Sequence, residues 1–97
     1  MRVFISQPMM GLTDERIKSE RERAITELQN RFGQGFDIID STIPNHEEMT
    51  ALECFAESIK FLSKADLAVF IEGWENARGC RLENAISLAY GTQVLYV

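Results

Sequence analysis

The chain has 97 residues, of which 45% are hydrophobic and 26% are charged. These fractions are typical of a folded globular protein, and the length allows one domain, residues 1–97, with a single core. The net charge of −5 argues against a DNA or RNA polymer as partner, because such binding requires a basic surface. A small anionic ligand is compatible with this charge, since helix amino ends and one or two arginines can hold it locally.

The reactive side chains are few. Cys54, Cys80 and His46 are the only cysteines and histidine, and their spacing matches no zinc site, disulfide scaffold or redox motif. We therefore expect no metal and no cofactor. No apolar run approaches the ~20 residues of a membrane span, and no signal-peptide pattern is recognisable. The sequence thus predicts a cytoplasmic protein with reduced thiols and no membrane partner.

Strand-like and helical patterns alternate from the first residues. Residues 3–5 predict a strand, and residues 7–12 predict a loop. Thr13 is typical of a helix N-cap, and apolar spacing predicts a first helix that ends near Gly33 and Gly35. The residues expected on its inward face are Ile17, Arg21, Ala24, Ile25, Leu28 and Phe32.

The next two elements follow the same alternation. Residues 36–39 predict a second strand, and Thr50 with Glu53 fits the capping box of a second helix. The buried stripe of this helix is expected to contain Leu52, Phe55, Ile59 and Leu62. Residues 67–71 predict a third strand without polar alternation, as expected where both faces are covered.

A third helix is expected from about Gly79 to Tyr90, with Gly91 at its end, and residues 93–97 predict a last strand. The side chains expected to point inward from this helix are Leu82, Ala85, Ile86 and Ala89. With right-handed crossovers, the alternation predicts an α/β fold whose parallel sheet is covered by helices on both faces. The strand order 2-1-3-4 places the topological switch between the loops 6–11 and 72–78, where such sheets bind ligands.

Glu83 follows the second of these loops and has two possible roles. At a helix start, unpaired N–H groups favour anions and keep a nearby carboxylate ionised, so Glu83 could act as a nucleophile. The simpler role, a partner of the helix dipole, is the more common one for such a residue. Trp74 could likewise cover the core or serve as a flat platform for a ligand.

Two arginines near the same loop leave a similar choice open. Arg78 and Arg81 could bind a phosphate group. They could equally neutralise Glu72 and Glu75, and the sequence slightly favours this second role.

Three segments resemble nucleoside 2-deoxyribosyltransferase-like proteins, most closely a small branch found in bacteria and phages. Residues 4–11 (FISQPMMG) resemble the first strand and the Gly-Pro-Met-x-Gly loop of that family. Residues 65–83 resemble its second signature, and residues 89–94 resemble its closing Ala-x-Gly and final strand. The resemblance covers nearly the whole chain, and its second signature is fairly specific.

The resemblance implies a flavodoxin/Rossmann-like three-layer sandwich and a nucleoside or nucleotide ligand. It also implies that Glu83 attacks the anomeric carbon of a deoxyribose, so that the base leaves and another base or water completes the reaction. The expected ligand-binding residues are Ser6, Gln7, Pro8, Met9, Gly11, Gly73, Trp74, Asn76, Arg78 and Gly79. Relatives assemble as dimers or larger oligomers, and the exposed edges of a four-stranded sheet make a homo-oligomer plausible here too.

Three positions depart from the family pattern. Gln7 replaces a glycine, which places a side chain where backbone would approach the ligand. Ser58 replaces an aspartate on the second helix, and Ala77 replaces a serine or aspartate six residues before Glu83. A general acid accelerates such a reaction about 10²–10⁴-fold, so a site that lacks two helper residues could react slowly or not at all. Two interpretations therefore stay open: a deoxyribosyl-transferring or hydrolysing enzyme, and a non-catalytic binder that senses or sequesters a nucleotide. A third, a vestigial pocket in an interaction module, is the least specific.

Overall fold

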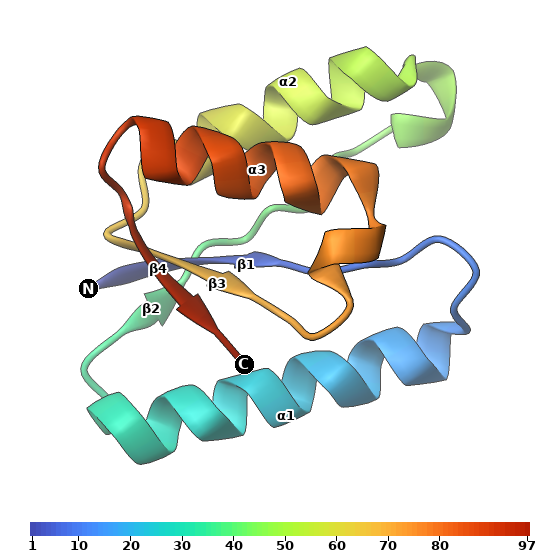
Figure 1. Cartoon of the computed structure of the whole chain (residues 1–97). Coiled ribbons are helices and arrows are strands. Elements are labelled where there is room, and N and C mark those ends of the chain that lie inside the picture. The colour runs from blue at the N-terminus through green and yellow to red at the C-terminus, as the bar shows by residue number, and fades with distance from the viewer.

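The computed structural model describes all residues, 1–97, and consists of a parallel sheet between two helical layers (Figure 1). The strands are β1 (Arg2–Ser6), β2 (Asp37–Ile38), β3 (Leu67–Phe70) and β4 (Gln93–Tyr96), and their order is β2-β1-β3-β4. All three strand pairs are parallel. The α/β class, the strand order and the flavodoxin/Rossmann-like sandwich are confirmed.

The long helices are α1 (Asp14–Phe32), α2 (Ala51–Leu62) and α3 (Arg78–Ala89), and two 3₁₀ turns, η1 (His46–Glu48) and η2 (Trp74–Asn76), precede α2 and α3. Figure 1 shows α1 on one face of the sheet and α2 with α3 on the other. The amino ends of α1 and α3 lie at the same rim, beyond the carboxyl ends of β1 and β3 (Figure 1). This rim is the topological switch, where the two crossovers from neighbouring strands leave in opposite directions.

Local capping agrees with the sequence. The Thr13 side chain accepts a hydrogen bond from the Arg16 N–H and begins α1. Thr50 and Glu53 form the expected capping box of α2. Gly91, with a φ of +75°, follows the end of α3 in a conformation that favours glycine.

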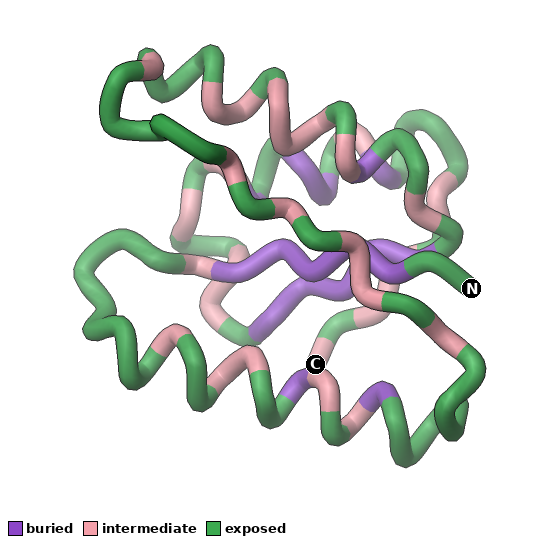
Figure 2. Tube along the Cα trace, turned by 180° about the vertical axis from the view of Figure 1, so that it is seen from behind, coloured by how far each residue is buried: buried purple, intermediate pink, exposed green.

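The sheet separates two apolar clusters, and its two central strands, β1 and β3, are the most deeply buried part of the chain (Figure 2). On the α1 side, Ala24 and Leu28 pack against alternate residues of β1 and β3. On the other side, Phe4, Leu62, Ala68 and Phe70 form the second cluster. Just before β3, the Asp66 carboxylate accepts a 2.7 Å hydrogen bond from the Arg2 N–H and so fixes the start of the neighbouring strand β1.

One residue of the face predicted for α2 and most of the face predicted for α3 are wrong. Leu52, in the first turn of α2, is 75% exposed, whereas Phe55 and Ile59 are half-buried and Leu62 is buried. In α3, Leu82, Ala85 and Ala89 are exposed, and Ile86 is only half-buried. The buried side chains of α3 are Cys80, Glu83, Asn84 and Ser87. Apolar spacing therefore misidentified the inward face of α3, which is mostly polar. The second strand is also shorter than predicted, only Asp37–Ile38.

Candidate functional site

Glu83 is the centre of the candidate site, and it lies in the second turn of α3 with 7% of its surface exposed. The Ser6 hydroxyl, at the end of β1, donates a 2.6 Å hydrogen bond to Oε1 of Glu83. The Ser58 hydroxyl, on α2, donates a 2.5 Å hydrogen bond to Oε2. One carboxyl group thus joins three elements that come from different parts of the sequence.

Burial changes the acid–base properties of this cluster. Burial raises the pKa of the Glu83 carboxyl, and the hydrogen bonds from Ser58 and Ser6 offset part of this rise. The helix dipole is the influence that the sequence indicates for this carboxyl; burial acts in the opposite direction and is the largest cause of the shift, and Glu83 lies beyond the first turn of α3, where the dipole effect fades. Burial also raises the pKa of the neighbouring Cys80 thiol, and the Glu83 charge adds to that rise.

A cleft of about 840 Å³ opens at the rim beside Glu83. Its walls come from the loop after β1, the amino end of α2, the loop after β3 and the amino end of α3. The residues that line it are Gln7, Pro8, Met9, Met10, Leu12, Arg16, Ile43, Ala51, Cys54, Phe55, Ser58, Glu72, Gly73, Asn76, Ala77, Arg78, Gly79, Cys80, Arg81 and Glu83. The volume is in the range of small-molecule sites.

The lining divides the cleft into an apolar part and a cationic part. Met9, Met10, Leu12, Ile43 and Phe55 supply apolar side chains from the loop after β1 and from the region around the start of α2. The cationic part lies at the start of α3, which has no side-chain cap. A ligand that carries both a flat apolar group and an anionic group would match this division.

The start of α3 keeps its positive character unneutralised. The N–H groups of Arg78, Gly79 and Cys80 have no acceptor within the chain. Neither Arg78 nor Arg81 takes part in an ion pair. Arg81 instead donates to the backbone carbonyl of Glu75, so the pairing of these arginines with Glu72 and Glu75 that the sequence favoured is wrong.

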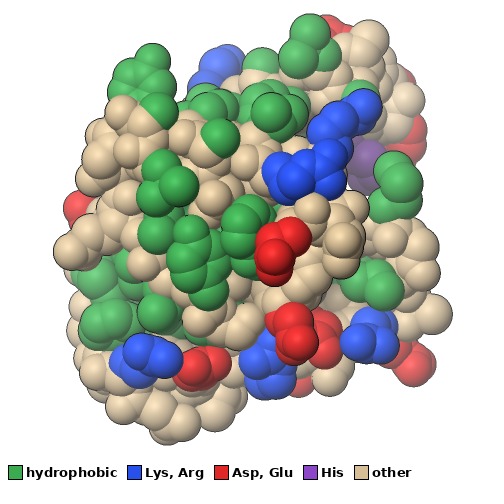
Figure 3. Space-filling model, viewed as in Figure 1, with side chains coloured by type: hydrophobic (Ala, Val, Ile, Leu, Met, Phe, Trp, Pro, Cys, Tyr) green, Lys and Arg blue, Asp and Glu red, His purple; other side chains and the backbone are tan.

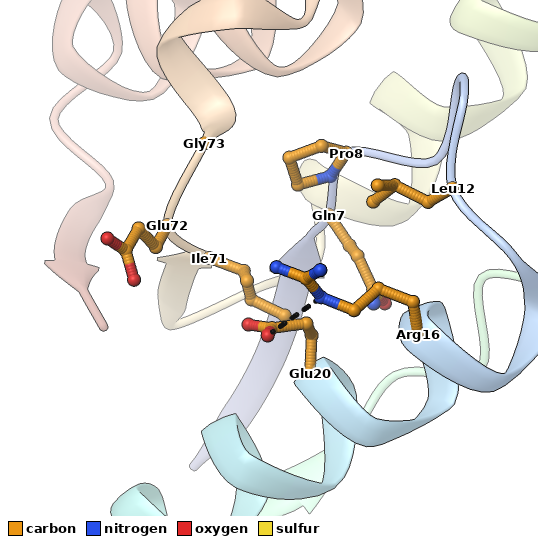
Figure 4. A pocket seen from close by; sticks show the side chains of 8 residues that line it. All are labelled: Gln7, Pro8, Leu12, Arg16, Glu20, Ile71, Glu72 and Gly73. Carbon is orange, nitrogen blue, oxygen red and sulfur yellow. Dashed lines mark hydrogen bonds and ion pairs between the residues drawn. The ribbon is translucent and has the colours of Figure 1, made fainter.

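Gln7 lines a smaller cavity of about 270 Å³ (Figure 4). Its side chain runs from the end of β1 toward α1, where its amide nitrogen donates to the Ile17 carbonyl. Its amide oxygen is buried without a partner. Beside it, Arg16 pairs with Glu20 at 3.3 Å, and Glu72 points away from both (Figure 4). The Gln7 side chain therefore binds the loop to α1 rather than occupying the middle of the larger cleft.

Most predicted site residues line the cleft, but three do not. Gln7, Pro8, Met9, Gly73, Asn76, Arg78 and Gly79 lie in its walls together with Glu83. Ser6 is nearly inaccessible and reaches the site only through its bond to Glu83. Gly11 is not part of the lining, and Trp74 stacks on Tyr96 with ring centroids 5.3 Å apart. Of the two roles that the sequence left open for Trp74, the structure shows the first: the ring covers the end of the sheet and does not line the cleft.

Sequence reasoning missed the role of Ser58. It was identified as a departure from the family's aspartate, yet its hydroxyl bonds directly to the Glu83 carboxyl. The signal was its position on the second helix, at which the sequence departs from the proteins that it resembles. No group of three or more His, Cys, Asp or Glu side chains is close enough to hold a metal ion.

Fold and site together define an α/β protein with a buried carboxyl group at the switch point of a parallel sheet. The chain belongs to the family described as a domain of unknown function (DUF4406), whose model matches residues 1–96. No curated protein and no solved structure matches the chain. None of its helices has the length and apolar character needed to cross a membrane.

Proposed function

We propose that the protein binds a nucleoside or nucleoside monophosphate in the cleft and cleaves or exchanges its N-glycosidic bond through Glu83. The observation that carries the proposal is the Glu83 carboxyl itself, buried at the cleft wall with each oxygen held by a serine hydroxyl. A carboxyl fixed in this way is directed at one point of a bound ligand, as covalent catalysis requires. The resemblance to nucleoside 2-deoxyribosyltransferase-like proteins supplies the substrate class.

In this reaction an Oε atom of ionised Glu83 forms a bond to the anomeric carbon of the deoxyribose. The carbon–nitrogen bond breaks, and its electron pair leaves with the base, which takes a proton from water or from an acid in the cleft. Water or a second base then attacks the same carbon and releases the carboxylate, so the configuration is retained. Glu72 is the only other carboxylate in the lining of the larger cleft, and it is our candidate for that acid.

The pH dependence follows from the burial of Glu83. The nucleophile must be ionised, and burial raises its pKa. Release of base should therefore increase as the pH rises through the pKa of Glu83.

The second candidate is a non-catalytic binder that senses or sequesters a nucleotide in the same cleft. The hydrogen-bond partners of Glu83 favour it, because both are serine hydroxyls and neither is a carboxylic acid. Serine hydroxyls orient a carboxylate but protonate a leaving base poorly. The two candidates share a ligand class and differ only in turnover.

Chromatography of free base separates them. The wild type is incubated with deoxynucleosides and their monophosphates, beside Glu83→Gln and the control Glu75→Gln, which removes an exposed charge. The enzyme is supported if base appears with wild type and Glu75→Gln but not with Glu83→Gln. Saturable calorimetric binding without base supports the binder, and neither binding nor release contradicts both.

Calorimetry of a matched nucleoside and 5′-monophosphate tests the cationic part of the cleft. We expect the monophosphate to bind more tightly, because the start of α3 and its two arginines, neither of which is in an ion pair, favour an anion. One charge-assisted hydrogen bond to the phosphate is worth about 1.5–3 kcal/mol. Added salt should narrow the difference. Equal affinities would mean that the phosphate does not bind at the amino end of α3.

A further inference from the structure

The outer edge of β4 is the longest edge of the sheet that has no neighbouring strand. β4 pairs with β3 without interruption from Gln93 to Tyr96, so it contains no bulge, and its other side has no strand beside it. The Val97 N–H and C=O face β3. Because backbone groups alternate along a strand, the N–H and C=O groups of Val94 and Tyr96 point outward, away from β3. The strand at the opposite edge, β2, contains only Asp37–Ile38 and therefore has fewer backbone groups for pairing with another strand.

Natural sheets protect such edges with charged side chains, proline or bulges. β4 has none of these features: residues 84–97 contain no charged side chain and no proline. All of the charged residues of the chain therefore lie before residue 84. Although each copy carries a net charge of −5, β4 itself brings no like-charged side chains together when it pairs with β4 of a second copy.

Exposed apolar side chains occur on β4 and at the end of α3, the helix that precedes it. Leu88 is 59% exposed on α3, Tyr90 follows the helix, and Tyr96 lies on β4 itself. Figure 3 shows hydrophobic side chains gathered over α3 and β4 on the face where this edge lies. An apolar surface beside an unpaired strand is typical of a covered interface rather than of a free one.

We propose that two copies of the chain pair through β4, antiparallel, about a two-fold axis at Leu95. In this register the outward N–H and C=O of Val94 face those of Tyr96 in the partner copy. Each copy then donates and accepts the same set of hydrogen bonds, so the edge is electrostatically complementary to itself. The two sheets become one continuous sheet, and Leu88 of each copy approaches the interface from α3.

Proline at position 94 tests the hydrogen bonds. Val94→Pro removes an N–H that does not bond to β3, so the fold should remain, whereas each copy loses one intermolecular hydrogen bond. Sedimentation velocity should show a dimer for the wild type and for the control Val94→Ala, with at least about tenfold weaker association for Val94→Pro. Circular dichroism verifies that each variant is folded. A monomeric wild type, or a folded Val94→Pro that dimerises as well as Val94→Ala, would overturn the proposal.

Cysteine cross-linking tests the register, and it remains informative if Val94→Pro does not fold. Leu95 lies on the axis as a non-hydrogen-bonded antiparallel pair, a geometry with Cα atoms about 4.5 Å apart that suits a disulfide. Mild oxidation should convert Leu95→Cys to a covalent dimer. Gln93→Cys, which would face Val97 of the partner copy, should stay largely uncrosslinked, as should the wild type with its native cysteines. Equal cross-linking of both variants would contradict the axis at Leu95.

Discussion

α1 and α3 cover opposite faces of one sheet, and their buried faces differ in chemistry. α1 buries Ala24 and Leu28 in an apolar cluster with β1 and β3. α3 buries Cys80, Glu83, Asn84 and Ser87. Each of the last three has a partner: Glu83 bonds to two serines, Asn84 donates to the Tyr96 hydroxyl at 2.8 Å, and Ser87 donates to the Glu83 carbonyl at 2.8 Å.

The difference shows that α1 and α3 contribute to different properties of the molecule. An apolar face such as that of α1 stabilises the fold in proportion to the area it removes from water. A polar face such as that of α3 contributes less, because hydrogen bonds replace those to water, but it fixes side chains in one geometry. The face that holds Glu83 is thus specialised for position rather than for stability.

The largest effect is expected on the α1 side. Leu28→Ala should lower the free energy of unfolding by about 2–5 kcal/mol, because it leaves a cavity in a fully buried cluster. Urea denaturation measures the change. Gln29→Ala, the exposed neighbour on the same helix, should change stability by less than about 0.5 kcal/mol. Similar losses for both variants would contradict the assignment of this face.

A smaller effect is expected from Ser6→Ala on the α3 side. The change leaves Oε1 of a buried carboxyl without its donor, which costs about 1–3 kcal/mol. Ser63→Ala, which removes an exposed hydroxyl bonded to the Lys60 carbonyl, is the matched control in thermal or urea unfolding. If the two serine variants are equally stable, the Ser6–Glu83 bond contributes nothing to the fold.

The third prediction concerns pH. The pKa of Glu83 is raised above its ordinary value of 4.5 in the folded state, so the folded protein holds this proton more tightly than the unfolded chain. Its contribution to stability is complete below pH 4.5 and is lost as the pH rises through the folded-state pKa. As the pH rises from 4.5 to the folded-state pKa, the wild type should therefore lose stability relative to Glu83→Gln. The loss is about 1.4 kcal/mol for each unit by which the pKa of Glu83 is raised. Glu75→Gln corrects for removal of a charge, and parallel pH profiles of wild type and Glu83→Gln would contradict the prediction.

The smallest effect is expected at Leu82. This residue belongs to the helical stripe that the sequence predicted to be buried, but it is 45% exposed. Leu82→Ala should lower the free energy of unfolding by less than about 1 kcal/mol, against the much larger loss at Leu28. A loss comparable to that of Leu28→Ala would mean that the apolar stripe of α3 faces inward after all.

The same contrast explains what the sequence could predict. Alternation of strands and helices, the caps at Thr13 and Thr50, and the strand order follow from local patterns and crossover handedness, so the fold was predictable. The face of α3 was not, because helical periodicity assumes that apolar side chains point inward. In α3 the buried positions hold a carboxyl and an amide whose partners come from β1, α2 and β4, and one hydroxyl that donates to the Glu83 carbonyl within the helix.

The site was predictable to the level of loops. Strand order identifies the switch between β1 and β3, and most of the predicted lining residues are there. Contacts that depend on packing between distant elements were not predictable. Ser58 meets Glu83 only because α2 and α3 lie side by side, and Trp74 turns to Tyr96 because three aromatic rings gather at the end of the sheet.

The two cysteines have a further consequence. Both line the cleft, Cys54 from α2 and Cys80 one turn before Glu83, and neither forms a disulfide. Cys54 is partly accessible, whereas Cys80 is buried and its raised pKa keeps it a thiol. An alkylating reagent should therefore modify Cys54 first, and a bound molecule should slow that reaction. The cleft thus contains its own chemical reporter of occupancy, and oxidation of the thiols would begin inside the cleft.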